Sequence, residues 1–221
     1  MIAKQIINDT IPTMGISDSA GRALHYMEFF RVSHLPVVNG KKYIGLLSDE
    51  AVFNLKKDEL SIEQCQIEKA NTFVYETQHV YDVLELMHRF KWSMVVVVNS
   101  KKQFLGAIGM NHLLSALAKI TSIDQSGSII VLKLGIRDYS LGQVAQIIEG
   151  QDVKILSTYV QNCTDQIHLK LTLKLNTTQI DGVRQALERF NYKIEAIFAE
   201  HQTMDELYKD RLDAFLHFLN I

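Results

Sequence analysis

The chain has 221 residues, of which 47% are hydrophobic and 22% charged, a composition that excludes disordered, collagen-like and coiled-coil proteins. Lys and Arg number 23 against 25 Asp and Glu, with 13 against 12 up to Ile120 and 10 against 13 after it. Neither half carries the basic excess that binding to a phosphate backbone requires, so we expect no nucleic-acid partner.

The first residues, MIAKQIINDTIPT, contain no uninterrupted apolar stretch, and no window approaches the roughly 18 apolar residues needed to cross a bilayer. The two cysteines, Cys65 and Cys163, lie far apart and form no Cys-x-x-Cys motif. This spacing argues against a disulfide framework, a zinc ribbon and a redox dithiol. We therefore expect a cytoplasmic protein with reduced thiols and no membrane contact.

An internal repeat occupies the first half of the chain. Shifting the sequence by sixty positions aligns identical residues: Leu24 with Leu84, Met27 with Met87, Phe30 with Phe90, Ser33 with Ser93, residues 37–39 with 97–99, and residues 41–42 with 101–102. One inserted residue then brings Gly45 onto Gly106. A shared helical pattern alone would not produce this run of identities, so the two segments are copies of one unit.

Both copies predict the same elements in the same order. Apolar residues at the spacing of one buried stripe predict helices over residues 20–30 and 80–90, and Ser17-Asp18-Ser19 can cap the first. Two apolar runs around a polar turn then predict a hairpin in each copy, and a further helix follows at 50–55 and 111–119. One unit of strand, helix, strand, strand and helix is too small to bury its apolar face alone. We expect the two copies to pack on each other.

The two copies resemble the paired cystathionine-β-synthase (CBS) domains of a Bateman module. The resemblance rests on Ile11-Pro12-Thr13, Ser17-Asp18-Ser19, Ala23-Leu24, Met27, the Arg-Val-Ser-His-Leu-Pro-Val-Val of residues 31–38, and Gly45-Leu46-Leu47-Ser48. Copy two lacks the proline in residues 92–96 and the hydroxyl residue at Gly109. The resemblance implies a first CBS repeat over residues 1–60 and a second over 61–122.

The second half predicts a different domain. After the small residues 126–128, strands are predicted at residues 129–134, 153–160, 167–175 and 192–198, with helices between the first and second and between the third and fourth. In residues 167–175, apolar and polar residues alternate strictly, which is typical of a sheet with one buried face. The order βαββαβ predicts a ferredoxin-like α+β domain.

This segment resembles an ACT domain, a regulatory module that binds amino acids at interfaces. The resemblance rests on residues 137–140, 141–148 and 151–155, and it implies an ACT-like domain over residues 128–200. A CBS pair followed by an ACT-like domain resembles the acetoin-utilisation accessory proteins of type B. Residues 203–221 begin with a capping-box sequence and predict an amphipathic helix that packs on its own chain or on a second subunit.

Reaction machinery is not visible in the sequence. It contains no G-x-G-x-x-G, G-x-x-x-x-G-K-[ST], H-E-x-x-H or G-x-S-x-G motif. The eight histidines are scattered, with no pair at i, i+4 beside a carboxylate. We therefore expect no catalytic residues, no metal site and no cofactor.

The CBS resemblance implies adenosine ligands in clefts between the copies. In that family a Ser or Thr three residues after the strand glycine meets phosphate, and an Asp six residues after it holds the ribose hydroxyls. Counting from Gly45 gives Ser48 and Ala51, and counting from Gly106 gives Gly109 and His112. The implied cleft residues are Ile11, Pro12, Thr13, His34, Ser48, Ala51, Gly109 and His112, with phosphate recognition outweighing ribose recognition.

The ACT resemblance implies a second site at Asp138, Tyr139 and Ser140, where the alternative is a turn whose Asp138 or Ser140 caps the helix. The leading function is a small-molecule-sensing regulatory protein, not an enzyme, that acts on an unidentified partner protein. The alternatives are a ligand-free assembly module and an enzyme without a recognisable motif. We also expect a homodimer.

Overall fold

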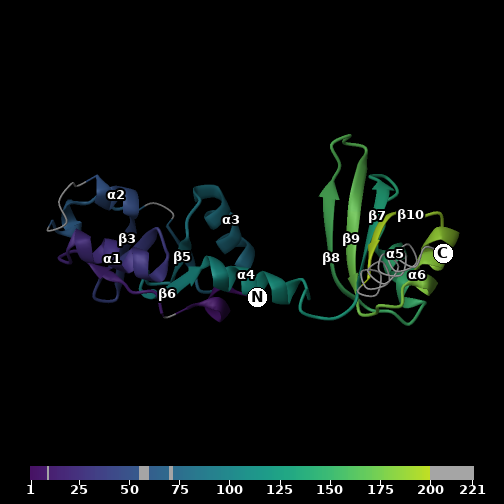
Figure 1. Ribbon diagram of the computed structural model, residues 1–221, viewed down its shortest axis with the longest axis horizontal. Helices are drawn as coiled ribbons and strands as arrows, with labels where there is room; N and C mark the ends of the chain where they lie inside the picture. Colours follow the sequence, from purple (N-terminus) through teal and green to yellow (C-terminus); the bar gives the residue numbers. More distant parts are fainter. Residues whose placement is uncertain (9, 55–59, 70–71, 200–221) are drawn as a thin grey trace, which may run out of the picture. The chain divides into compact units, whose positions relative to one another are not determined.

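The computed structural model describes residues 1–8, 10–54, 60–69 and 72–199 (Figure 1). They divide into two compact units, Met1–Leu117 and a second unit that starts at Ala118. The helix predicted over 203–221 lies outside the described residues. No helix of the described part is long and apolar enough to span a membrane.

The first unit contains both copies of the repeat. Copy one has the 3-10 helix η1 (Ala3–Ile6), β1 (Met14–Gly15), α1 (Ala20–Phe30), β2 (His34–Asn39), β3 (Lys42–Ser48) and α2 (Asp49–Phe53). Copy two has η2 (Ile62–Gln64), β4 (Phe73–Tyr75), α3 (Val80–Phe90), β5 (Met94–Val98), β6 (Phe104–Gly109) and α4 (Met110–Ile120). The sheets β1-β2-β3 and β4-β5-β6 each have one parallel and one antiparallel pairing. The strand and helix order predicted for one unit is confirmed.

Local sequence explains why α1 and α3 begin and end at equivalent residues. The Ser19 hydroxyl accepts a hydrogen bond from Arg22 N at 3.3 Å and so caps α1. Arg31 and Lys91 end the two helices in the left-handed region, with φ of 53° and 58°. Each helix buries one stripe of small and apolar side chains: Ala20, Ala23 and Met27 in α1, and Val80, Val83 and Met87 in α3.

The two copies exchange the segments that precede their first strands. Asn8 of copy one donates its backbone N–H to Ala107 O of β6 at 2.8 Å. At the equivalent place in copy two, Glu68 forms an antiparallel bridge with Leu46 of β3, through backbone hydrogen bonds of 2.8 and 2.9 Å. Each copy therefore gives backbone hydrogen bonds to an outer strand of the other copy's sheet, to β6 or to β3. A single copy alone would leave that outer strand without these bonds.

The second unit has the element order βαββαβ. Its elements are β7 (Ser128–Gly135), α5 (Leu141–Glu149), β8 (Ile155–Asn162), β9 (His168–Leu175), α6 (Asp181–Arg189) and β10 (Lys193–Phe198). All pairings in the sheet β10-β7-β9-β8 are antiparallel, which is the ferredoxin-like arrangement. Strand β8 starts at Ile155 instead of 153: Lys154 N donates to the Asn176 side chain at 2.8 Å, while Lys154 O accepts from Asn176 N at 3.1 Å.

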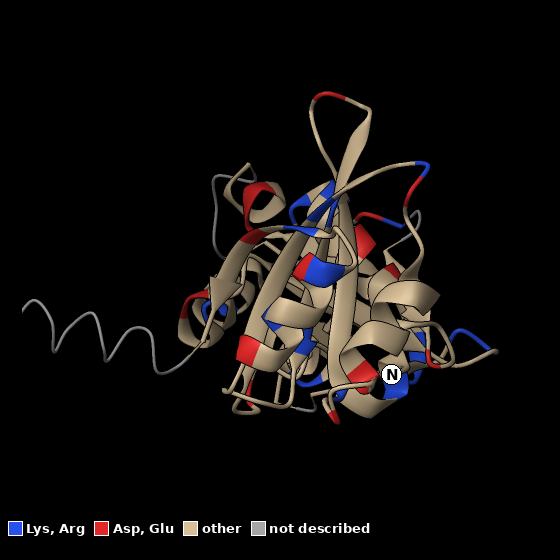
Figure 2. Ribbon diagram, turned by 90° about the vertical axis from the view of Figure 1, so that its right-hand side faces the viewer, with Lys and Arg blue, Asp and Glu red and all other residues tan. Residues whose placement is uncertain are grey.

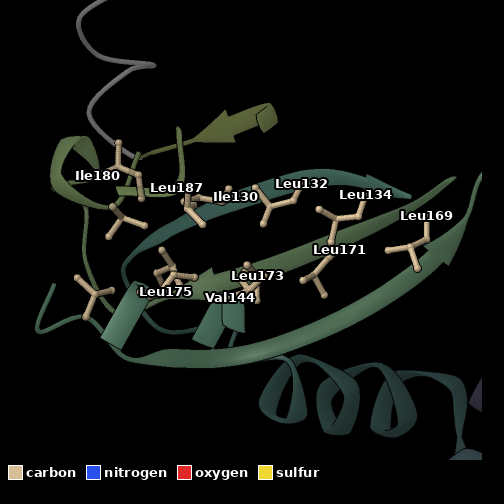
Figure 3. Close-up of a cluster of buried hydrophobic side chains, with 13 residues drawn as sticks. Ile130, Leu132, Leu134, Val144, Leu169, Leu171, Leu173, Leu175, Ile180 and Leu187 are labelled. Carbon is tan, nitrogen blue, oxygen red and sulfur yellow. The ribbon is translucent and has the colours of Figure 1, made fainter. Parts of the chain in front are cut away.

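The core of this unit lies between the sheet and its two helices (Figure 3). Alternate residues of β9 supply it, as the alternation in residues 167–175 predicted: Leu169, Leu171, Leu173 and Leu175. The prediction was wrong for Ile167, which precedes β9 and is exposed, and for Thr172, which is buried on the other face. Ile130, Leu132 and Leu134 of β7 belong to the same core. Val144 of α5 and Leu187 of α6 close it from the helical side, and both are fully buried. Figure 2 marks Lys and Arg in blue and Asp and Glu in red, and both colours are interspersed along the ribbon.

Candidate functional site

The copies meet at two equivalent serines, each of which precedes the second strand of its copy. The Ser33 carbonyl accepts from Asp49 N at 3.0 Å, and the Ser93 carbonyl accepts from Met110 N at 3.2 Å, so the same contact starts α2 and α4. The Ser93 hydroxyl also accepts from Ser33 N at 3.1 Å. This hydrogen bond joins the strand-to-helix junctions of the two copies directly.

His34, Ser48 and Ala51 form a group at the junction of copy one. His34 and Ser48 are paired residues of β2 and β3. The Ser48 hydroxyl accepts from Ala51 N at 3.2 Å and caps α2, which leaves its own O–H free to donate to a ligand. The His34 ring lies 3.0 Å from Ser33 Oγ and 3.4 Å from Ser93 Oγ. Burial lowers the pKa of His34, and the Asp49 carboxylate opposes that shift.

Ile11, Gly109 and His112 form the group at the junction of copy two. A Cβ on Gly109 would lie 3.6 Å from Ile11 Cδ1. His112 is exposed, and its Nδ1 lies 3.4 Å from the Asn8 side-chain amide. Residues 12 and 13 are half-buried and lead from Ile11 into β1. The sequence interpretation combined residues 11–13 with Ser48, but the segment exchange carries Asn8 and Ile11 to copy two.

Comparison with known families identifies the repeat. The CBS domain family matches residues 3–58 and 67–119, which are the two copies. Residues 3–119 therefore contain a tandem pair of CBS domains.

Solved structures with a similar fold cover about half of the chain. A CBS domain pair/ACT domain protein from Thermotoga maritima is 20% identical, with 53% of this chain and 96% of that chain covered and a TM-score of 0.48. A putative acetoin utilization protein, AcuB, from Vibrio cholerae is 18% identical, with 56% and 95% covered and a TM-score of 0.48. CBSX2, solved in complex with AMP, is 17% identical, with 54% and 97% covered and a TM-score of 0.47.

Both junctions of the CBS pair carry hydrogen-bonding side chains. The Ser48 O–H and the His34 ring offer hydrogen bonds at the first junction, and the His112 ring offers them at the second. Ala51 and His112 stand where the resemblance implies a carboxylate. Asp49 and Glu50 lie on the first turn of α2, where Asp49 Oδ1 accepts from Glu50 N at 2.7 Å.

Ser93 and Asn8 are the polar residues of these junctions that sequence reasoning missed. For Ser93, the identity with Ser33 across the repeat was a signal, because equivalent residues of two copies that pack together can contact each other. For Asn8 no sequence signal was available. Its contact with His112 depends on the segment exchange, which joins residues 104 positions apart.

The turn before α5 divides the roles of its three residues. The Ser140 hydroxyl accepts from Gln143 N at 3.4 Å, so Ser140 is the helix cap. Tyr139 packs against the core. Asp138 is exposed, and its Oδ2 lies 2.5 Å from the place where a Cβ on Gly135 would stand. Of the three, Asp138 has the side chain most available to a ligand.

Within the part of the chain that the structure describes, no three His, Cys, Asp or Glu side chains are grouped closely enough to hold a metal ion. Asp165 and His168 in the β8–β9 hairpin form a pair, with 2.8 Å between Asp165 Oδ2 and His168 Nδ1. This hydrogen bond lowers the pKa of Asp165 to about 2.

Proposed function

We propose that this protein is a small-molecule-sensing regulatory protein whose CBS pair binds an adenosine-type ligand at the strand-to-helix junctions. The observation that carries the proposal is the Ser48 hydroxyl. It lies at the position where the CBS family meets phosphate, it keeps a free O–H, and it stands beside His34 at the point where the two copies touch. Phosphate recognition dominates, because Ala51 and His112 offer no carboxylate to the ribose.

The regulatory step follows from the serine pair. A phosphate that accepts from the Ser48 O–H binds beside the first turn of α2, where Asp49 N donates to the Ser33 carbonyl oxygen. Ser33 N in turn donates a hydrogen bond to the Ser93 hydroxyl of copy two. A ligand that binds one arrangement of these hydrogen bonds more tightly shifts the equilibrium between arrangements of the two copies. A partner protein that binds only one of these arrangements then responds to the ligand.

The second unit supports an additional sensing role. Its βαββαβ order and the residues 137–155 resemble an ACT domain, so we propose that it binds an amino acid with Asp138 as the contact to the ammonium group. The domain order then matches that of the type B acetoin-utilisation accessory proteins.

Strand β8 supports a homodimer. It is an outer strand of its sheet, and its eight residues, Ile155–Asn162, contain no charge and no proline. Tyr159 and Val160 are 52% and 43% exposed. Proteins protect free sheet edges with charges, as β10 does with Lys193 and Glu195, so an unprotected edge fits pairing with the same strand of a second copy. Light scattering should show a dimer at micromolar concentration, and a stable monomer contradicts this part.

The alternative, a ligand-free assembly module, predicts no ligand response. Thermal-shift measurements on the full chain with AMP, ADP, ATP and the free amino acids separate the two, because a ligand that binds the native state raises its melting temperature. We expect adenine nucleotides to raise it, and Ser48→Ala to reduce that increase relative to its own unliganded value. Ser115→Ala is the control, because the Ser115 hydroxyl donates within α4, to Asn111 O. A chain that responds to no ligand overturns the sensing proposal.

A further inference from the structure

A groove of about 880 Å³ runs between α5 and α6 of the second unit. Its lining includes Gly150, which has no side chain, and Ala186, which has only a methyl group. Gly135 at the end of β7, Lys193 at the start of β10 and Tyr192 just before it border the groove. Its volume is in the range of pockets that hold small metabolites.

Four side-chain amides, from Gln143, Gln146, Gln151 and Asn191, line the groove. Gln143 and Gln146 come from successive turns of α5, and Asn191 follows α6. The Gln143 carbonyl oxygen accepts from the Tyr192 hydroxyl at 3.3 Å, which leaves the Gln143 amide hydrogens available as donors. Such N–H donors can form hydrogen bonds with the oxygens of a small anion such as a carboxylate.

The charge of the groove is set by Arg189, the last residue of α6. Arg184 on the same helix is paired with Asp181 and Glu188, at 3.8 and 3.3 Å. Among residues 1–8, 10–54, 60–69 and 72–199, no ion pair is formed by Arg189, and its guanidinium carbon lies 5.6 Å from the Phe190 ring centroid.

Two lysines of the lining add to the positive charge of the groove. Lys193 and Lys133 are directly paired residues of β10 and β7, and both line the groove. Lys133 Nζ lies 3.9 Å from Asp165 Oδ2, so its charge is partly balanced. Asp138 is the acidic residue of the described lining. The groove therefore carries an excess of positive charge around a guanidinium that has no carboxylate partner of its own.

We propose that this groove is a binding site for a small organic carboxylate, with Arg189 as the residue that holds the carboxylate. A guanidinium binds both oxygens of a carboxylate in parallel, and the neighbouring amides supply further donors. Asp138 then decides the class of ligand: a simple dicarboxylate uses Arg189 alone, whereas an amino acid also places its ammonium group on Asp138. This site shares Asp138 with the amino-acid sensing proposed above but is independent of nucleotide binding by the CBS pair.

The test is calorimetric titration of the full chain with two probes, glutarate and glutamate, at one ionic strength set with NaCl. At least one probe should bind, and Arg189→Gln should weaken it tenfold or more. Arg184→Gln is the matched control, because it removes an arginine of the same helix that is already paired, and it should change the affinity less than twofold. Arg189 is exposed, so its substitution should leave the melting temperature of the unliganded chain unchanged.

Asp138→Asn distinguishes an amino acid from a simple dicarboxylate as the ligand of the groove. If it weakens glutamate but not glutarate, the groove reads amino acids; if it changes neither and glutarate binds at least as well, the groove proposal stands and the amino-acid proposal fails. Amide chemical shifts should move in residues 143–151 and 189–193. The proposal is overturned if neither probe binds, if Arg189→Gln binds as well as the parent, or if the shifts move elsewhere.

Discussion

Gly45→Ala tests the segment exchange between the two CBS repeats. A Cβ on Gly45 would overlap the Glu68 carbonyl oxygen and lie 2.5 Å from Ile67 Cγ2. Residues 67 and 68 belong to the second CBS match and cross over β3 of the first. An added methyl group therefore pushes the exchanged segment of copy two away from copy one.

The size of the effect follows from what the segment must give up. Glu68 is held against Leu46 by two backbone hydrogen bonds, of 2.8 and 2.9 Å. At about 0.5–1.5 kcal/mol each, their loss costs roughly 1–3 kcal/mol. Overpacking of a filled site costs a similar amount, about 1–3 kcal/mol. Both routes predict that the free energy of unfolding of the CBS pair falls by about 2 kcal/mol.

Trp92 provides the assay, because it is the one tryptophan of the chain and is 4% exposed against the Phe90 ring, with 4.6 Å between centroids. Urea titrations followed by its fluorescence should show an earlier midpoint for Gly45→Ala, and hydrogen exchange at the amides of Leu46 and Glu68 should accelerate. Gly109→Ala is the control, since its Cβ meets Ile11 at an ordinary 3.6 Å. If Gly45→Ala is as stable as the parent, the account of the exchange is wrong.

Three further outcomes are expected. Since burial lowers the pKa of His34, this histidine is protonated at a higher pH in the unfolded chain than in the native CBS pair. The CBS pair should therefore lose stability as the pH falls through about 6.5, and His34→Gln should flatten that decline; equal slopes would refute it. The Asp165 carboxyl should titrate at about 2 by NMR and move upward in His168→Gln; an unmoved value would contradict the hydrogen bond. Gly142→Ala, with open space around its Cβ in α5, should stabilise the second unit by about 0.5–1 kcal/mol, and a loss of stability would show a contact there.

Local signals predicted the elements because their causes are local. The stripe in α1, the cap at Ser19 and the alternation along β9 each depend on residues within one element, and each was readable from spacing. The hairpins followed from a polar turn between two apolar runs. The repeat then carried each interpretation from copy one to copy two.

Contacts across long separations could not be read in the same way. Asn8 N reaches Ala107 O because the segment before the first strand of each copy lies against the other copy. Residues 1–13 contain no sequence feature that distinguishes such a segment from one that stays with its own copy. The groove beside Arg189 needs α5, α6 and β10 to be placed together before an unpaired guanidinium becomes visible. The sequence named Asp138 as a candidate, but it gave no reason to connect that residue with Arg189.

Calorimetric titration of AMP into the full chain and its Ala51→Asp variant tests nucleotide sensing by the CBS pair most directly. Ala51 is the third residue of α2, where a carboxylate is favourable for the helix and stands at the position that the family uses for ribose. The account predicts weak binding by the parent and at least tenfold tighter binding by Ala51→Asp, or about 1.4 kcal/mol, with little gain for Ala51→Asn. Absence of AMP binding in both the parent and Ala51→Asp would contradict the account and leave the second unit as the sensor.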